Sequence, residues 1–122
     1  MSMSRFRLKG QKLRLTENDI ERQVIDLLRW RGYYVIRQHV GLFKTPDGRC
    51  VQIGEAGLPD YAVIHSRHPG FLLEVKRPGG RTSPTQDRML ERLQIGYRLA
   101  VVVVSDVKVL SAWLDRHEKG SK

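Results

Sequence analysis

The amino-acid sequence predicts an α/β fold in which a mixed central sheet is flanked by helices. Apolar residues recur at helical spacing between Thr16 and Gly32, which indicates an amphipathic helix. Two β-rich runs at 61–65 and 71–76 are separated only by a turn, so we expect antiparallel neighbours. The apolar run at 99–104 is too short for a helix and follows a helical segment, which is typical of a buried strand after a crossover. Helices and strands in this order form a layered sandwich.

The first half of the chain is predicted to hold one helix, one strand and one hairpin. Thr16 begins the helix, because Thr-Glu-Asn-Asp has the form of a capping box. A β-rich run at 33–36 follows Gly32, where the helical spacing ends. Residues 40–53 surround Thr-Pro-Asp-Gly at 45–48, a composition that favours a tight turn between two strands.

The second half adds two helices, each marked by a capping residue. Ser83 as N-cap and Pro84 as first helical residue begin one helix, and Gly96 ends it. Ser105 or Asp106 caps the last helix. The full order is helix, four or five strands, helix, strand, helix, without an internal repeat.

Length and composition restrict the classes of function. A chain of 122 residues has room for one core, so we expect a basic arm at 1–15 and a single domain at 16–122. No membrane-length apolar run or export signal is present, so we expect a cytoplasmic protein without membrane contact. Cys50 is the single cysteine, which excludes an internal disulfide. The 22 Lys and Arg against 13 Asp and Glu, a net charge of +9, favour nucleic acid as partner.

Three charged residues stand where the surrounding strands are apolar. Glu74 and Lys76 flank Val75, so their side chains leave the same face of one strand. Asp60 enters the neighbouring strand and comes to lie beside Glu74 when the two strands pair. Adjacent carboxylates repel unless a cation lies between them, which predicts Mg²⁺ or Mn²⁺. The Val75 carbonyl offers a further metal ligand.

A lysine beside such a metal has a role in phosphodiester hydrolysis. It orients or deprotonates the attacking water and helps to neutralise the charge on the phosphate. The alternative is that Glu74 and Lys76 form an exposed ion pair without function, since this spacing is common in charged sequences. The apolar residues at 71–73 and the Gly/Pro loop after Lys76 favour a functional site, because idle charges in a core strand are costly.

The segments Gly57-Leu58-Pro59-Asp60 and Glu74-Val75-Lys76 resemble the PD-(D/E)xK nuclease superfamily. The resemblance implies a restriction-endonuclease-like three-layer sandwich, with an acidic residue on the first helix that completes the metal site. Glu21 is the first choice for that residue, because 21–28 is similar to the first helix of archaeal Holliday-junction resolvases. Glu17 stays open as the alternative.

The loop at 77–83 and the helix start Pro84-Thr85-Gln86 resemble a narrower group, the VRR-NUC (virus-type replication-repair nuclease) domains of the stand-alone phage or bacterial type. This resemblance covers about residues 16–105 and implies that Gln86 lies close to the metal site. It implies a homodimeric, metal-dependent endonuclease that cuts branched DNA such as four-way (Holliday) junctions, in a bacterium or a phage-infected cell and without a small-molecule cofactor. The alternatives are a non-catalytic branched-DNA-binding module and a flap or replication-fork nuclease. A sequence-specific restriction enzyme is disfavoured, because the chain has no room for a recognition subdomain.

DNA contacts are expected mainly at phosphates, because recognition of a branched shape requires backbone positioning. The candidate basic residues of the domain are Arg77, Arg81, Lys44 and Arg49. The arm adds Arg5, Arg7, Lys9, Lys12 and Arg14. A solvated surface charge is the alternative for each of them. An apolar dimer patch has as candidates Trp30, Tyr33, Tyr34, Leu42 and Phe43, each otherwise expected in the core.

Overall fold

The computed structural model describes residues 15–120, so the predicted arm lies outside the described residues except for Leu15. The elements are α1 (Glu17–Trp30), β1 (Tyr34–Arg37), β2 (Gly41–Lys44), β3 (Cys50–Ile53), β4 (Tyr61–Ile64), β5 (Phe71–Val75), α2 (Pro84–Glu91), the π-helical turn η1 (Arg92–Gly96), β6 (Val101–Val104) and α3 (Val107–Lys119). This order matches the one that the sequence predicts. No helix of the described part is long and apolar enough to cross a membrane.

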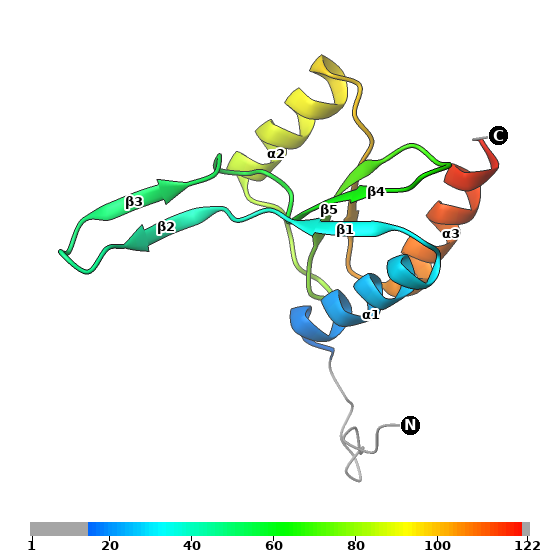
Figure 1. The fold of residues 1–122 in the computed structure, drawn as a ribbon, viewed down its shortest axis with the longest axis horizontal. Coiled ribbons are helices and arrows are strands. Elements are labelled where there is room, and N and C mark those ends of the chain that lie inside the picture. Colours follow the sequence, from blue (N-terminus) through cyan, green and yellow to red (C-terminus); the bar gives the residue numbers. More distant parts are fainter. Residues whose placement is uncertain (1–14, 121–122) are drawn as a thin grey trace, which may run out of the picture.

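A four-stranded mixed sheet forms the centre of the fold, with the strand order β1-β4-β5-β6 (Figure 1). β4 pairs antiparallel with both β1 and β5, as the short turn between β4 and β5 predicts. β5 and β6 run parallel, and the chain between them forms α2 and η1. The predicted α/β fold with a mixed sheet is therefore confirmed.

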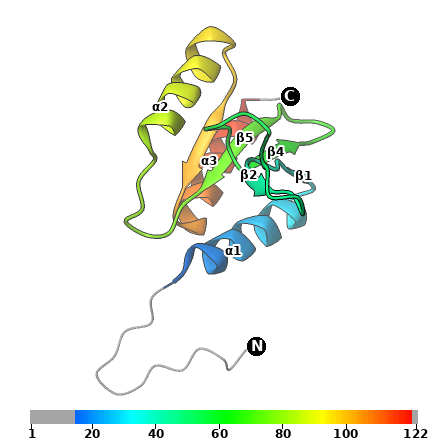
Figure 2. The same cartoon turned by 90° about the vertical axis from the view of Figure 1, so that its left-hand side faces the viewer.

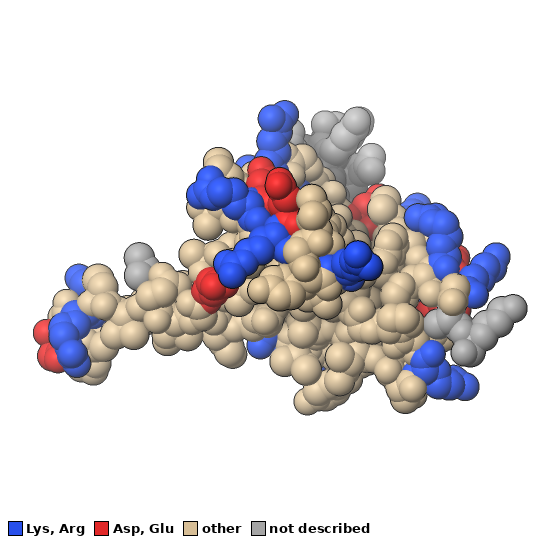
Figure 3. Space-filling view, turned by 90° about the horizontal axis from the view of Figure 1, so that it is seen from above, with Lys and Arg blue, Asp and Glu red and all other residues tan. Residues whose placement is uncertain are grey.

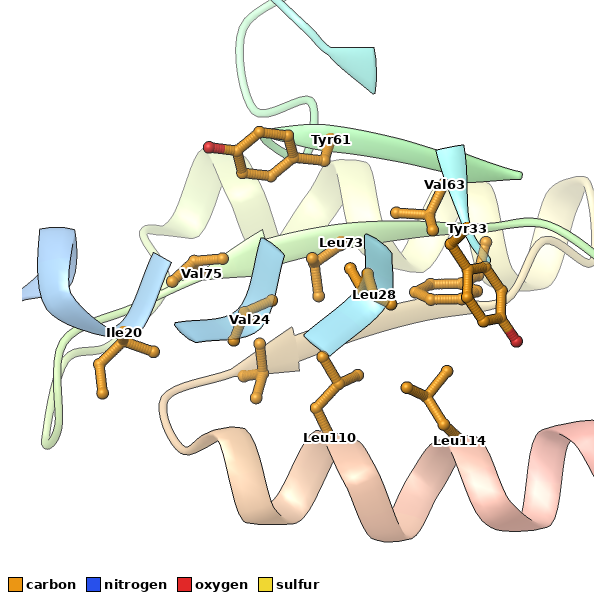
Figure 4. Close-up of a cluster of buried hydrophobic side chains, with 12 residues drawn as sticks. Ile20, Val24, Leu28, Tyr33, Tyr61, Val63, Leu73, Val75, Leu110 and Leu114 are labelled. Carbon is orange, nitrogen blue, oxygen red and sulfur yellow. The ribbon is translucent and has the colours of Figure 1, made fainter. Parts of the chain in front are cut away.

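α1 and α3 pack together on one face of the sheet and enclose the hydrophobic core (Figure 4). Strand alternation explains the packing, because every second residue of β4 and β5 points to this face. The buried core residues are Ile20, Val24, Leu28, Tyr33, Tyr61, Val63, Phe71, Leu73, Val75, Val104, Leu110 and Leu114. α2 lies on the other side of the sheet (Figure 2). Its Met89 is buried outside this core cluster.

The predicted hairpin is present as a separate two-stranded sheet of β2 and β3. The chain turns at 45–48, where Gly48 has φ +87°, a conformation that favours glycine. The hairpin projects away from the central sheet (Figure 1). None of the hairpin side chains that the structure describes belongs to the core cluster.

The strand at the end of the apolar run is less buried than the sequence predicts. We expected 99–104 to be a buried strand, but Leu99 is 43% exposed and Val103 is 42% exposed. β6 is an edge strand, because it pairs only with β5. Its Val104 turns toward the core, whereas Val103 lies on the opposite, outer face.

Candidate active site

Asp60 and Glu74 meet at one end of the β4–β5 pair. The main-chain N–H of Asp60 donates to Glu74 Oε1 at 3.1 Å, and the N–H of Val75 donates to Asp60 Oδ2 at 3.2 Å. These two reciprocal bonds tie each carboxylate to the opposite strand. The prediction that strand pairing places the two carboxylates beside each other is confirmed.

Lys76 and Gln86 extend the pair into a connected polar network. Lys76 Nζ lies 3.3 Å from Glu74 Oε2 and donates to Gln86 Oε1 at 3.0 Å. Gln86 Nε2 donates to Glu74 Oε2 at 3.0 Å. Ser83 caps α2 in a capping box with Gln86, which fixes the position of the amide. The network thus joins the end of β5 to the first turn of α2.

Burial works against the charges of both carboxylates. Glu74 is only 4% exposed, and desolvation followed by the neighbouring charge of Asp60 raises its pKa, against the opposing effect of Lys76. Desolvation also raises the pKa of Asp60, and the charge of Glu21 adds to this rise. The N–H of Val75 and the charge of Arg37 counteract it. A cation between the two carboxylates would relieve this penalty.

The structure separates the two candidate glutamates of α1. The half-buried Glu21 forms an ion pair with Arg37 at 3.5 Å and contributes to the electrostatics of Asp60. Glu17 is exposed in the first helical turn, where its charge suits the helix dipole. Of the two, only Glu21 is therefore placed beside the site.

Sequence reasoning missed two residues next to Glu21. Arg37 of β1 lies opposite Tyr61 of β4 in the strand register, and Arg37 Nη1 donates to the Tyr61 hydroxyl at 2.9 Å. Burial and hydrogen bonding to Glu21 raise the pKa of Tyr61. No spacing or motif signals this group, because its members come together only through β1–β4 pairing and the packing of α1.

The oxygen atoms at this end of the sheet suit a hard divalent cation. Within residues 15–120, no three His, Cys, Asp or Glu side chains are grouped closely enough to hold a metal ion by themselves. Asp60 and Glu74 supply two carboxylates, and the main chain of Val75 faces Asp60. Since the N–H and C=O of a strand residue point to the same edge, the Val75 carbonyl is available on this side. Mg²⁺ normally completes such a small ligand set with water.

The candidate DNA-binding residues fall into two places. Arg77 and Arg81 are exposed in the loop that leads from Lys76 to α2, next to the site. Lys44 and Arg49 lie at the end of the hairpin, where Arg49 Nε is 3.0 Å from the Asp47 carboxylate. Figure 3 shows charged side chains at this tip and over the α2 region, with a largely uncharged stretch between them. The structure does not bring the hairpin residues to the carboxylates.

The aromatic residues considered for a dimer patch include both buried and exposed side chains. Tyr33 is 3% exposed and belongs to the core. Trp30, Tyr34 and Phe43 are exposed at 84%, 67% and 48%. The side chain of Leu42 lies outside the described residues.

No protein-family model matches the chain, and no curated protein matches it. The chemistry of the network around Glu74 is therefore the basis on which a function is assigned.

Proposed function

We propose that this protein is a divalent-metal-dependent endodeoxyribonuclease that hydrolyses phosphodiester bonds in branched DNA. We also propose that the chain is a VRR-NUC domain with the three-layer architecture of restriction endonucleases. The observation that carries it is the network of Asp60, Glu74, Lys76 and Gln86, in which the buried carboxylate of Glu74 and the half-buried carboxylate of Asp60 adjoin a lysine. A merely structural ion pair does not require the second carboxylate, whose proximity raises the pKa of Glu74.

Each residue has a role in the hydrolysis. Asp60, Glu74 and the Val75 carbonyl would hold Mg²⁺ or Mn²⁺, and Glu21 would complete the acidic set. The bound cation would supply positive charge at the phosphate and lower the pKa of a water molecule. Lys76 orients the attacking water and offsets the negative charge that develops on the phosphate oxygens.

Gln86 acts on the charged side chains of Glu74 and Lys76 together. It accepts from Lys76 and donates to Glu74, so it holds the ammonium beside the carboxylate. Water adds to phosphorus while the bond to one bridging oxygen breaks, and the products are a phosphate monoester and a hydroxyl. Because Gln86 acts through Glu74 and Lys76, it is a positioning residue. Lys76 is the residue that faces the reacting phosphate.

The substrate that we favour is a four-way junction cut by a homodimer in a bacterial or phage-infected cytoplasm. The net charge of +9 suits a polyanionic partner. A single site per chain cuts one strand, and symmetric resolution of a junction requires two, which a twofold dimer provides. Arg77 and Arg81 are exposed beside the site and suit contacts to DNA phosphates.

The test is a cleavage assay on matched linear, flap and four-way DNA with Mg²⁺, Mn²⁺ or EDTA. Wild-type protein is expected to nick the four-way substrate only with metal, and Asp60→Ala or Lys76→Ala should abolish cleavage while DNA binding remains. Arg116→Ala, on the exposed surface of α3, is the matched control and should cleave normally. Cleavage that persists in both site variants would contradict the proposed site. Faster cleavage of flaps would change the substrate, and metal-independent binding without cleavage would indicate a non-catalytic module.

A further inference from the structure

Arg37 carries a guanidinium that folding alone does not explain. Its side chain is 56% exposed, and its ion pair with Glu21 is 3.5 Å long. Exposed ion pairs of this kind contribute little to stability. The pair nevertheless lies beside the acidic residues Asp60 and Glu74, where a positive charge can act on a bound metal or on the DNA.

The ring and the hydroxyl of Tyr61 both contact this guanidinium. The carbon at the centre of the Arg37 guanidinium lies 5.5 Å from the centre of the Tyr61 ring, and Nη1 donates to the hydroxyl at 2.9 Å. Tyr61 itself is 3% exposed, so this support is rigid. An arginine that is already oriented loses less freedom when it binds a ligand.

The remaining donors of Arg37 are open to a ligand. Arginine has five N–H donors, and the contacts of Arg37 with Tyr61 and Glu21 both use Nη1. Within the described residues, Nε and Nη2 have no protein partner. A planar group with two free nitrogens on one edge matches the two non-bridging oxygens of a phosphodiester.

The surrounding charges require such a cation. Asp60 directly precedes Tyr61 in the chain, and Arg37 lies opposite Tyr61 in the strand register and 3.5 Å from Glu21, so two carboxylates flank this position. A DNA phosphate that approaches Glu21 and Asp60 meets like charge, which Arg37 offsets. Lys76 lies on the other side of the site, where its ammonium contacts Glu74 and Gln86 rather than Glu21, so Arg37 adds a second cation to it.

We propose that Arg37 binds a backbone phosphate of the DNA strand at the active site. Tyr61 and Glu21 position the guanidinium for this contact. This inference rests on the proposed function, because it names a contact to the substrate of that same site. It adds a DNA-binding residue to the loop arginines Arg77 and Arg81, on the opposite, β1 side of the carboxylates.

The experiment measures binding of a four-way DNA junction by fluorescence anisotropy, in EDTA and over a series of NaCl concentrations. Arg37→Gln keeps a polar group near Tyr61 but removes the charge, and we expect about tenfold weaker binding. The slope of log affinity against log salt should fall by about one, as for the loss of one phosphate contact. Arg37→Lys should restore the slope, because an ammonium also neutralises a phosphate.

Arg116→Gln is the matched control, since it removes the same charge from an exposed position on α3 and should leave the slope unchanged. An unchanged slope in Arg37→Gln, with normal wild-type binding, would overturn this inference and leave the proposed function intact. Wild-type protein that does not bind DNA at all would overturn both. Thermal unfolding of each variant separates a lost contact from a lost fold, and a misfolded Arg37→Gln leaves Arg37→Ala to give the same comparison.

Discussion

Gln86 performs two tasks with one side-chain amide. Its Oε1 accepts from the Ser83 N–H at 2.9 Å and from Lys76 Nζ at 3.0 Å, while its Nε2 donates to Glu74 at 3.0 Å. The first bond belongs to the cap of α2, and the other two belong to the charged network. Because the amide offers an acceptor and a donor, no carboxylate can make all three bonds.

Gln86→Glu separates these two tasks. Glutamate keeps the capping box with Ser83, so the melting temperature should change little. The new carboxylate would face Glu74 without a donor and would compete for Lys76, so cleavage should fall by about 10- to 100-fold, as for other supporting residues of metal sites. Initial cleavage rates and thermal unfolding of the same protein sample measure both effects. Gln86→Ala is the comparison that loses cap and network together; normal cleavage by Gln86→Glu would contradict the positioning role.

At the scale of elements, the β2–β3 hairpin is separate from the part of the fold that carries the core. A two-stranded hairpin has little stability of its own in water. Phe43, Val51 and Ile53 are each at least 40% exposed, and the register places Phe43 opposite Val51. The central sheet does not depend on this hairpin for its core.

Replacement of residues 42–52 by a short Gly linker should therefore leave the free energy of unfolding nearly unchanged. Gly41 and Ile53 are register partners, so a short linker spans the gap without moving β1 or β4. DNA affinity should fall, because the deletion removes Lys44 and Arg49. Chemical denaturation and anisotropy measure the two effects, and the double variant Lys44→Ala/Arg49→Ala should match the loss of affinity. A large loss of stability on deletion would show that the hairpin supports the core.

Local signals explain why most elements could be predicted from the sequence. The caps at Thr16 and Ser83 and the turn at 45–48 depend on neighbouring residues alone, and the structure has each of them. The exposure of β6 depends on its edge position, which results from the order of strands in the sheet. Apolar composition does not specify that order. The predicted strand is present at Val101–Val104, but the expectation that the run at 99–104 is buried was wrong for Leu99 and Val103.

The candidate site shows the same division. Asp60 and Glu74 could be placed together because a short turn joins their strands, and β-strand alternation puts Lys76 on the side of Glu74. Arg37 could not be placed, since it reaches Glu21 only after β1 pairs with β4 and α1 packs on the sheet.

At the scale of the whole molecule, packing of the core makes the charges of the acidic site less favourable. Tyr61 and Val75 are buried in the same cluster as the helices α1 and α3, and they directly adjoin Asp60 and Glu74 in the chain (Figure 4). Folding therefore draws two carboxylates out of water, which raises the pKa of each. A cation that binds both carboxylates would offset this desolvation penalty and stabilise the fold.

The direction of the pH dependence follows from these two raised pKa values. The metal-free folded protein holds more protons than the unfolded chain between the ordinary and the raised pKa values of Asp60 and Glu74, so their contribution to stability falls as pH rises through that window. Asp60→Asn removes one of the two charges and can still accept from Val75 N–H through its amide oxygen. In EDTA at neutral pH, this variant should melt above wild type, by roughly 2–5 °C for about 1 kcal/mol.

Mn²⁺ should reverse the ranking of the two proteins. A cation that binds only the folded state adds about 2.7 kcal/mol at a hundred times its dissociation constant. Wild type has both carboxylates and should gain this stability, whereas Asp60→Asn has lost one ligand and should gain little. Scanning calorimetry in EDTA and in Mn²⁺ measures the four melting temperatures. An equal Mn²⁺ shift in both proteins would place the cation elsewhere on the molecule, and a lower melting temperature of Asp60→Asn in EDTA would mean that the Asp60 charge stabilises the fold.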